Sequence, residues 1–212
     1  MIPFRGRLSF RQYVKGKRHM FGVKVFKLCL KGGHIYNMMI YCGKTEPISD
    51  LVRNSVVMFL INDILENGRI FYTNNWYTST TLARKLLEKS THLIGTLRRN
   101  RKYTPKNIVN AKFKKGELLV LQTKDGISVM KWRDKRDVLF LSMLHMDTQN
   151  EVRHHQGQKK KQFAIIAYNS AKSFIDVSDQ MSSYSSVIRR SIKWNRKVAV
   201  EVILGTSVIN SL

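Results

Sequence analysis

Cysteine, proline and acidic residues are all scarce in this sequence of 212 residues. The two cysteines, Cys29 and Cys42, are too few for a disulfide-stapled secreted domain or for a cysteine-rich zinc module. No apolar run reaches the length of about 20 residues that a membrane-spanning helix needs. The residues after Met1 do not form the apolar core of a signal peptide. These absences predict a reduced, intracellular protein with no membrane partner.

The shortage of negative charge dominates the composition. Asp and Glu together number 14 against 38 Lys and Arg, which leaves a formal net charge of +24. A surface this positive repels itself unless a polyanion neutralises it, and nucleic acid is the usual polyanion. Charge alone does not distinguish specific DNA binding from the unspecific binding of a ribosomal or chromatin protein. An anionic membrane is disfavoured, because no basic amphipathic helix carries an apolar face rich in Trp or Phe.

The first half of the sequence alternates strand and helix patterns. Hydrophobic residues (43%) and charged residues (25%) are in globular proportion, and the length suits one domain with a core. A basic, turn-rich arm at 1–22 is expected to be irregular. The elements expected after it are strands at 23–30 and 34–42 joined at Gly32-Gly33, a helix from Ser49 to about Glu66, a strand at 69–73, a helix at 80–90 and a strand at 93–97. This order predicts an α/β fold with parallel neighbours in the sheet.

The second half changes character after the charge run at 98–102. Alternating patterns predict β-hairpins over 111–145, which either extend the main sheet or form an insertion. The polar stretch 147–161 predicts a flexible loop. The last elements expected are a strand at 163–167 and helices at about 171–187 and 193–212.

A series of short motifs runs through the whole chain. They are Pro3-Phe4-Arg5-Gly6-Arg7, Phe10-Arg11-Gln12-Tyr13, Phe21-Gly22-Val23-Lys24, Tyr41-Cys42-Gly43-Lys44, Asn75-Trp76-Tyr77-Thr78-Ser79, Gly95-Thr96-Leu97-Arg98-Arg99-Asn100-Arg101, Tyr168-Asn169, Asp176-Val177-Ser178-Asp179-Gln180-Met181, Trp194 and Ile209-Asn210-Ser211. In order and spacing they resemble the catalytic domain of piggyBac-type transposases. Each motif alone is weak evidence, whereas the ordered set is specific.

The resemblance implies an RNase H-like mixed sheet flanked by helices, and DNA transposition by metal-dependent strand cleavage and transfer. Two Mg²⁺ ions roughly 4 Å apart must flank the reacting phosphate in such a site. Carboxylates hold them, because Mg²⁺ prefers anionic oxygen ligands. We accordingly divide the chain into a basic arm (1–22), an RNase H-like core (23–97), a β-rich insertion with a loop (98–161), and a C-terminal strand and helices (162–212).

The resemblance also locates the three acidic positions of the family, and the sequence keeps one of them. The first Asp belongs to an Asp-Glu-x-Met segment, so it would lie three residues before Met1. The second position falls on Asn74, whose carboxamide keeps the shape and loses the charge. The third falls on Asp176, with Asp179 one helical turn later as an accessory. Without the resemblance, these two would be an ordinary charge pair near a helix N-terminus.

Two further departures from the family concern the backbone. Ser173-Phe174 stands where the family usually has two small glycines, which puts the local backbone geometry before Asp176 in question. The strand that carries the first Asp would precede Met1, so strands near 23–31 and 69–73 are expected to lack a neighbour. Each unpaired buried amide or carbonyl would cost about 1–3 kcal/mol.

The preferred interpretation is a transposable element-derived protein that is catalytically inactive and retains DNA binding. Asp176 and Asp179 would be a vestigial metal position, no cofactor is expected in this form, and Mg²⁺ belongs to the ancestral reaction. We expect a nuclear protein that binds DNA non-specifically and electrostatically. The residues expected to contact phosphates are Arg5, Arg7, Arg11, Lys15, Arg98, Arg99, Arg101 and Lys102.

Three alternatives remain open at this point. The chain could be a fragment of a still-active transposase whose missing N-terminal part supplies the first Asp. It could be a basic structural protein unrelated to transposition, or a chain with no selected function. Asn74 argues against the first alternative and the ordered motifs argue against the second.

Overall fold

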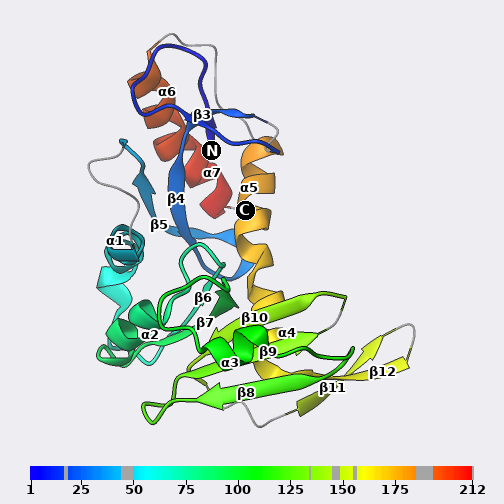
Figure 1. Cartoon of the computed structure of the whole chain (residues 1–212). Helices are drawn as coiled ribbons and strands as arrows, with labels where there is room; N and C mark the ends of the chain where they lie inside the picture. The colour runs from blue at the N-terminus through cyan, green and yellow to red at the C-terminus, as the bar shows by residue number, and fades with distance from the viewer. Residues whose placement is uncertain are drawn as a thin grey trace. The chain divides into compact units, whose positions relative to one another are not determined.

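The polypeptide divides into two units of mixed α and β structure in a computed structural model of the chain (Figure 1). Unit 1 combines both ends of the chain, Met1–Ile61 and Ser173–Leu212, and unit 2 is the continuous segment Asn62–Lys172. The structure describes residues 1–16, 19–43, 50–133, 135–144, 149–154, 157–184 and 193–211. None of the helices within these residues is long and apolar enough to cross a membrane.

Short strands in the N-terminal arm form a three-stranded antiparallel sheet in the order β1-β3-β2. They are β1 (Ile2–Pro3), β2 (Gln12–Tyr13) and β3 (Phe21–Val23). The prediction of an irregular arm over 1–22 is therefore wrong for these residues. These strands are too short to show a recognisable alternation of apolar residues. They also pair residues that are far apart in sequence, such as Ile2 with Val23. Gly22 permits this pairing, because a Cβ there would collide with the Ile2 carbonyl oxygen.

The predicted hairpin forms at Gly32-Gly33. β4 (Val25–Cys29) and β5 (Ile35–Ile40) are antiparallel and are joined by the short 3₁₀ helix η1 (Lys31–Gly33). Both glycines have positive φ angles, 83° and 91°, which residues with a side chain rarely adopt. A Cβ on Gly33 would also lie 2.9 Å from Val177 Cγ1 in α5 (Ser173–Tyr184). Glycine therefore sets how closely the hairpin approaches this helix.

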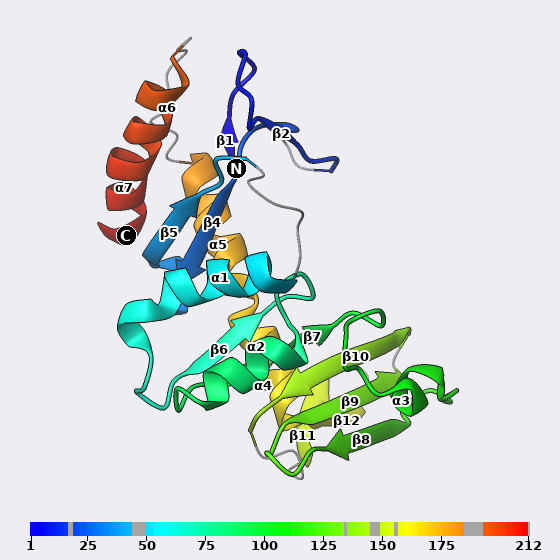
Figure 2. The ribbon, with the colours of Figure 1, turned by 60° about the vertical axis from the view of Figure 1, so that its left-hand side comes forward.

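Helices from both ends of the chain cover this hairpin in unit 1 (Figure 2). They are α1 (Asp50–Ile61), α5, α6 (Trp194–Val200), the π-helical η3 (Glu201–Gly205) and α7 (Thr206–Ser211). Asn210 in α7 clamps the start of β5: its Oδ1 accepts the Ile35 N–H at 2.8 Å and its Nδ2 donates to the Ile35 carbonyl oxygen at 2.9 Å. The predicted C-terminal helices are thus confirmed within the described residues. The first predicted helix ends earlier, at Ile61, and the 3₁₀ helix η2 (Asn62–Ile64) follows it.

Unit 2 is built on a five-stranded mixed sheet in the order β6-β7-β10-β9-β8. Its strands are β6 (Ile70–Thr73), β7 (His92–Leu97), β8 (Leu118–Gln122), β9 (Ser128–Arg133) and β10 (Asp137–Ser142). β6 and β7 are parallel and α2 (Thr80–Leu87) connects them, while the other neighbours are antiparallel. The predicted strand-helix-strand unit is confirmed. The predicted hairpins over 111–145 extend this sheet, and α3 (Lys106–Asn110) lies before them in the chain.

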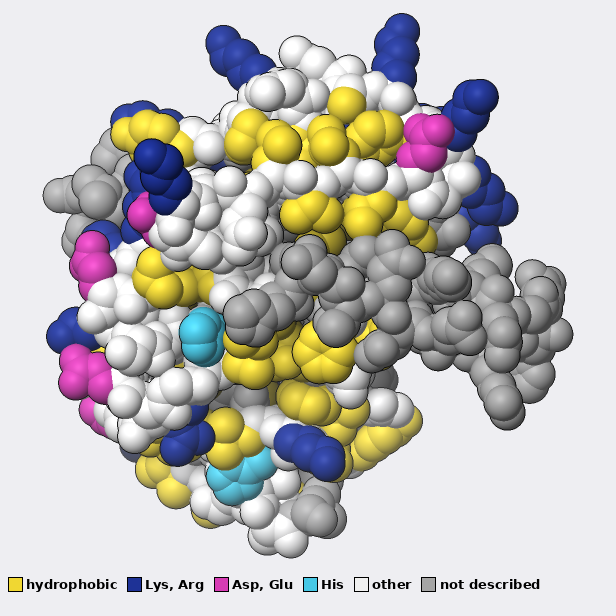
Figure 3. Space-filling view, turned by 90° about the horizontal axis from the view of Figure 1, so that it is seen from below, with side chains coloured by type: hydrophobic (Ala, Val, Ile, Leu, Met, Phe, Trp, Pro, Cys, Tyr) yellow, Lys and Arg dark blue, Asp and Glu magenta, His cyan; other side chains and the backbone are white. Residues whose placement is uncertain are grey.

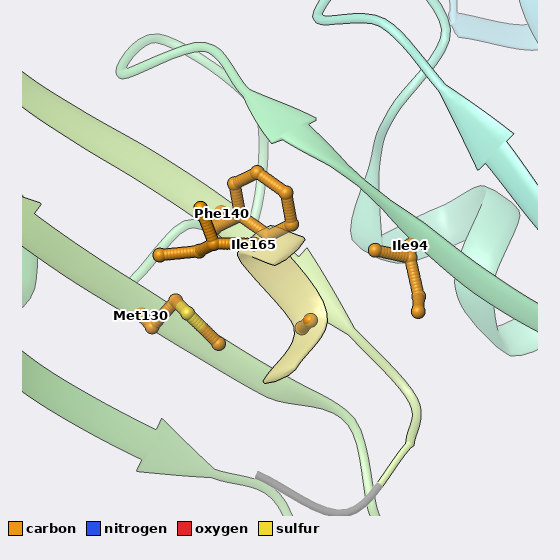
Figure 4. Close-up of a cluster of buried hydrophobic side chains, with 5 residues drawn as sticks. Ile94, Met130, Phe140 and Ile165 are labelled. Atoms are coloured by element: carbon orange, nitrogen blue, oxygen red, sulfur yellow. The ribbon is translucent and has the colours of Figure 1, made fainter. Parts of the chain in front are cut away.

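The segment predicted as a strand at 163–167 is helical, and the prediction is wrong. α4 (Phe163–Ala171) begins there. A short run of apolar residues does not separate a buried strand from a buried helix by periodicity, which is why the sequence misleads at this point. Ala164 and Ile165 are buried in a core cluster with residues of the sheet (Figure 4), namely Ile94 of β7, Met130 of β9 and Phe140 of β10.

The polar stretch 147–161 also differs from its prediction as a loop. β11 (Gln149–His154) and β12 (Gly157–Gln162) form an antiparallel hairpin. Polar and charged residues dominate both strands, so the apolar alternation that marks a half-buried strand is missing from the sequence. Residues 145–148 and 155–156 lie outside the described residues.

Like the other edge strands, β4 and β6 each have a single hydrogen-bonded neighbour among the described strands. β4 pairs with β5, and β6 pairs with β7. The same holds for β5 and β8, so single pairing does not test the prediction that the strands near 23–31 and 69–73 lack a neighbour.

One lysine is buried in the core of unit 2. The side chain of Lys131 is 2% exposed, and its Nζ lies 3.2 Å from Asp137 Oδ2. The same ammonium donates to the carbonyl oxygens of Val109, at 3.0 Å, and Ala111. The ring centroid of Phe113 is 5.1 Å from it. The lysine therefore joins the segment after α3 to the sheet, with its charge paired and its N–H groups satisfied.

Replacing Lys131 with Met keeps most of the side-chain volume and removes the ammonium. We expect the free energy of unfolding to fall by about 3 kcal/mol, because the carbonyls of Val109 and Ala111 lose their donor and Asp137 loses its buried partner. Urea denaturation measures this change. As a control, Lys124→Met alters an exposed lysine of the same unit and should change stability by less than about 0.5 kcal/mol. Equal effects of the two substitutions would contradict the structural role of Lys131.

Candidate functional site

Asn74 lies directly after β6, in a turn that its own side chain stabilises. Its Oδ1 accepts the N–H of Trp76 at 3.0 Å, and its carbonyl oxygen accepts the N–H groups of Tyr77 and Thr78, each at 3.1 Å. This side-chain turn ends the strand and leaves Asn74 exposed. A carboxylate oxygen would accept the same Trp76 N–H, so the turn suits Asp as well as Asn.

Gly95 allows this turn to pack against β7. A Cβ at residue 95 would collide with the Thr73 carbonyl oxygen and with the Thr78 hydroxyl. Thr78 Oγ1 lies 2.8 Å from Thr73 Oγ1 and donates to the Asn74 carbonyl oxygen at 2.9 Å. Two motifs that are separate in the sequence therefore form one structure at the end of β6.

The basic residues after β7 do not share one role. Arg98 is exposed, and its Nε donates to Asn75 Oδ1 at 3.2 Å. Arg101 is only 9% exposed, and its guanidinium donates to the carbonyl oxygens of Asn75, at 3.1 Å, and Trp76. The prediction that Arg101 contacts a phosphate is therefore corrected, because its hydrogen bonds hold the turn that contains Asn74's neighbours.

Arg99 and Lys102 extend from the same segment and remain exposed. Arg99 Nη2 lies 3.2 Å from Asp137 Oδ2 in an ion pair in which the arginine side chain is 59% exposed. Burial opposes ionisation of Asp137, but Lys131, Arg133 and Arg99 outweigh it and hold the pKa of this carboxyl below its ordinary value. Arg99 is therefore partly neutralised within the protein, which weakens its expected contribution to phosphate binding.

Asp176 and Asp179 lie near the start of α5 in unit 1, separated by one helical turn. Asp176 is exposed, whereas Asp179 Oδ1 lies 3.6 Å from Nζ of Lys27 on β4. The same Nζ is 3.5 Å from Ser178 Oγ and 3.4 Å from Ser182 Oγ. A lysine ammonium therefore lies beside the carboxylate that was predicted to be a vestigial metal ligand.

A cavity of about 490 Å³ adjoins this ion pair within unit 1. Its polar lining includes Lys27, Asp179, Ser182 and Glu201. Burial raises the pKa of the Glu201 carboxyl, although Lys27 and the terminal ammonium act in the opposite direction. Burial likewise raises the pKa of the nearby Cys29 thiol. For both groups, burial therefore disfavours the ionised form.

The predicted catalytic residues within the chain are divided between the two units. Asn74 belongs to unit 2, and Asp176 and Asp179 belong to unit 1, where the structure brings the two aspartates together on one helix. Ser173 and Phe174 form the first residues of this helix and have no positive φ angle. The two residues that replace the usual glycines are therefore accommodated by ordinary helical backbone.

The family comparison covers the complete chain and defines its class. The model of the family described as Transposase IS4 matches residues 1–212, and the chain belongs to this family of DDE-type transposases. Its fold is similar to the piggyBac transposase in a cryo-EM structure of a synaptic complex with hairpin DNA, with a TM-score of 0.81, 24% sequence identity and 98% of this chain covered. The chain spans 45% of that piggyBac chain. The resemblance and the RNase H-like α/β fold expected from the sequence are confirmed.

The family implies a divalent metal in the ancestral reaction. The residues of this chain can therefore be compared with the ligands that such a metal needs. In the part of the chain that the structure describes, no group of three His, Cys, Asp or Glu residues is placed to hold a metal ion. Asp179 already has the Lys27 ammonium beside it, and Asn74 offers a neutral amide in place of a carboxylate. These residues do not fit a magnesium centre, so no catalytic step is assigned to one.

Four Arg and Lys residues in the described part of the N-terminal arm are exposed, as a phosphate contact would require. They are Arg5, Arg7, Arg11 and Lys15. The face of the molecule in Figure 3 likewise carries more Lys and Arg than Asp and Glu side chains. The charge excess of the composition therefore appears on the surface, apart from the few cations that are paired inside.

Sequence reasoning missed Lys27 and the aromatic pair Tyr13 and Phe21. Lys27 lies between Phe26 and Leu28 in a strand, and a lysine in such a context predicts a carboxylate partner on a covering element. Nothing in the sequence identifies Asp179 as that partner. Tyr13 and Phe21 become neighbours only through the pairing of β2 with β3.

Substituting Asn74 with Asp tests whether the turn accepts a carboxylate. We expect the free energy of unfolding to change by less than about 0.5 kcal/mol, because the acceptor for the Trp76 N–H is retained. The matched variant Asn74→Ala removes the acceptor and should destabilise the protein by about 1 kcal/mol. Thermal unfolding of the three proteins measures both effects. An equal loss of stability in the Asn74→Asp and Asn74→Ala variants would show that the turn requires the amide group.

Proposed function

We propose that this chain is a transposase-derived protein that binds DNA non-specifically through exposed basic residues, lacks strand-transfer catalysis and resides in the nucleus. The observation that carries the proposal is Asn74, which stands directly after β6 at the position that the resemblance assigns to the family's second acidic residue and carries no charge. A two-metal reaction depends on carboxylates at such positions.

The environment of Asp179 supports the same proposal. Lys27 lies 3.6 Å from this carboxylate, with Ser178 and Ser182 around the ammonium. A fixed cation at this place competes electrostatically with a metal ion. An active site that had kept its metals would instead favour an unpaired carboxylate there.

The charge distribution supports DNA as the partner. The net charge is +24, and the exposed cations include Arg5, Arg7, Arg11 and Lys15 in unit 1 and Arg98, Arg99 and Lys102 in unit 2. The piggyBac transposase with a similar fold is bound to hairpin DNA in its synaptic complex. Phosphate contacts of this kind give affinity without sequence preference.

A second candidate is a part of a still-active transposase in which another segment supplies the first Asp. The observation that favours it is length, because the chain spans 45% of the piggyBac chain that it resembles in fold. Asn74 and the Lys27–Asp179 pair argue against this candidate.

Salt dependence tests DNA binding directly. Fluorescence anisotropy measures the binding of a labelled duplex of about 20 base pairs. The logarithm of the binding constant should fall linearly with the logarithm of the salt concentration, because each phosphate contact adds about 0.9 to the magnitude of the slope. Changing Arg5, Arg7 and Arg11 together to Gln should lower the slope by roughly 3 for every duplex sequence. The control changes Arg84 and Lys85 to Gln. Both residues are exposed on α2 and do not belong to the proposed phosphate-binding set. Equal slopes for the parent and the triple variant would contradict the proposal.

Nicking of supercoiled DNA in Mg²⁺ or Mn²⁺ tests the proposed lack of catalysis. We expect no nicking above background from the chain or from its Asn74→Asp variant, because neither has the carboxylates for two metals. Cutting by the unaltered chain would overturn the proposed lack of catalysis. Cutting by the Asn74→Asp variant alone would show that the Asn at position 74 is the single change that prevents catalysis at an otherwise complete site.

A further inference from the structure

Two aromatic side chains lie together on the surface of the N-terminal arm. Tyr13 of β2 pairs in register with Phe21 of β3, and their ring centroids are 5.0 Å apart with the planes tilted by 47°. Tyr13 is 56% exposed, Phe21 is 40% exposed and the adjacent Met20 is 45% exposed. Tyr13 Oη lies 3.8 Å from Met20 Sδ, so the three side chains form one continuous patch.

The patch is separate from the core of unit 1. The core cluster beside the arm consists of Ile2, Phe4, Val23 and Val198, with Phe10 and Trp194 packed against it. Phe10 and Trp194 meet edge to face at 5.1 Å, which is a typical buried arrangement. Tyr13 and Phe21 face solvent on the same small sheet. Their exposure leaves apolar ring surface available to a ligand.

Positive charge is fixed next to these rings. The guanidinium of Arg11 lies 5.2 Å from the ring centroid of Phe21. Arg11 Nη1 also donates to the carbonyl oxygens of Arg5, at 2.6 Å, and Gly6, at 3.0 Å, which holds its plane in place. No Asp or Glu occurs in the sequence from Met1 to Thr45, so nothing acidic in this part of the chain opposes an anion.

We propose that the patch formed by Tyr13, Met20 and Phe21 is a platform on which an unpaired DNA base stacks, while Arg5, Arg7, Arg11 and Lys15 bind the flanking phosphates. The proposal rests on the proposed DNA binding and adds to it a preference for single-stranded or unpaired DNA. Aromatic rings accept the π-face of any base, and neighbouring cations hold the backbone. Bases within a duplex are stacked on each other and cannot reach such a surface.

The chemistry of the patch favours a nucleobase over other occupants. A protein partner for a surface this basic would need a complementary acidic surface around an apolar contact. A membrane would be recognised by charge and apolar insertion, which requires a longer apolar face than three side chains. A base with its phosphate matches both the size of the rings and the charge beside them.

Oligonucleotides with equal numbers of phosphates and different bases test this proposal. The probes are a fluorescent thymidine strand of about 15 nucleotides, an abasic strand of the same length and a duplex. We expect the intact protein to bind the thymidine strand about tenfold more tightly than the abasic strand. Tyr13→Ala and Phe21→Leu should each reduce this ratio toward one, with little change for the abasic strand. Phe21→Leu keeps apolar volume and removes only the aromatic face, so it separates stacking from folding.

The controls distinguish stacking from a general loss of structure. Tyr13→Phe keeps the ring and should keep the preference for bases, whereas Tyr36→Ala removes an exposed tyrosine on β5 and should leave every affinity unchanged. Equal binding of the thymidine and abasic strands by the intact protein would overturn the platform and leave DNA binding standing. No binding to any of the three probes would overturn the proposed function as well. Loss of binding to anionic vesicles in Phe21→Leu, with no base preference in the parent, would assign the patch to a membrane instead.

Discussion

The absence of a side chain at Gly95 is the constraint on which the arrangement around Asn74 depends. It allows β7 to approach the end of β6 so closely that the Thr73 carbonyl and the Thr78 hydroxyl occupy the space of a Cβ. The turn is then held from within by the Asn74 side chain and from the neighbouring segment by Arg101. None of these contacts requires a charge on residue 74. The geometry of this turn therefore suits Asn and Asp alike at residue 74.

The charged residues of this protein serve two distinct purposes. Buried or half-buried cations stabilise structure: Lys131 joins α3 to the sheet of unit 2, Lys27 anchors α5 to β4, and Arg101 supports the turn. Exposed cations of the arm have no Asp or Glu in their own sequence segment, and Arg11 among them contacts backbone carbonyls and the Phe21 ring. The composition alone cannot separate these groups. For that reason net charge predicts the class of partner better than it predicts the residues that contact it.

Local sequence patterns predicted the fold best where the structure is locally determined. The turn at Gly32-Gly33, the strand-helix-strand unit and the strands near 118–142 follow from glycine conformation and apolar periodicity. The helix at Phe163 was mistaken for a strand, since a five-residue apolar run has no period of its own. The motif gave the position of Asn74, and its Asn-rich segment predicts the turn at 74–79, but the hydrogen bonds that hold this turn do not follow from the sequence. The pairing of Lys27 with Asp179 and the burial of Arg101 depend on contacts between distant parts of the chain. Such contacts cannot be predicted from a single sequence.

The clamp between Asn210 and Ile35 has a consequence for the order in which the chain can fold. It joins residues 175 positions apart, and unit 1 as a whole draws on the first and the last segments of the chain. Unit 2 is continuous, so during synthesis it can collapse while the strands of unit 1 still await α5 and α7. Loop closure over such a separation is slow compared with local contacts. Until α5 and α7 are made, the faces of the β4–β5 hairpin that they cover would stay exposed to water.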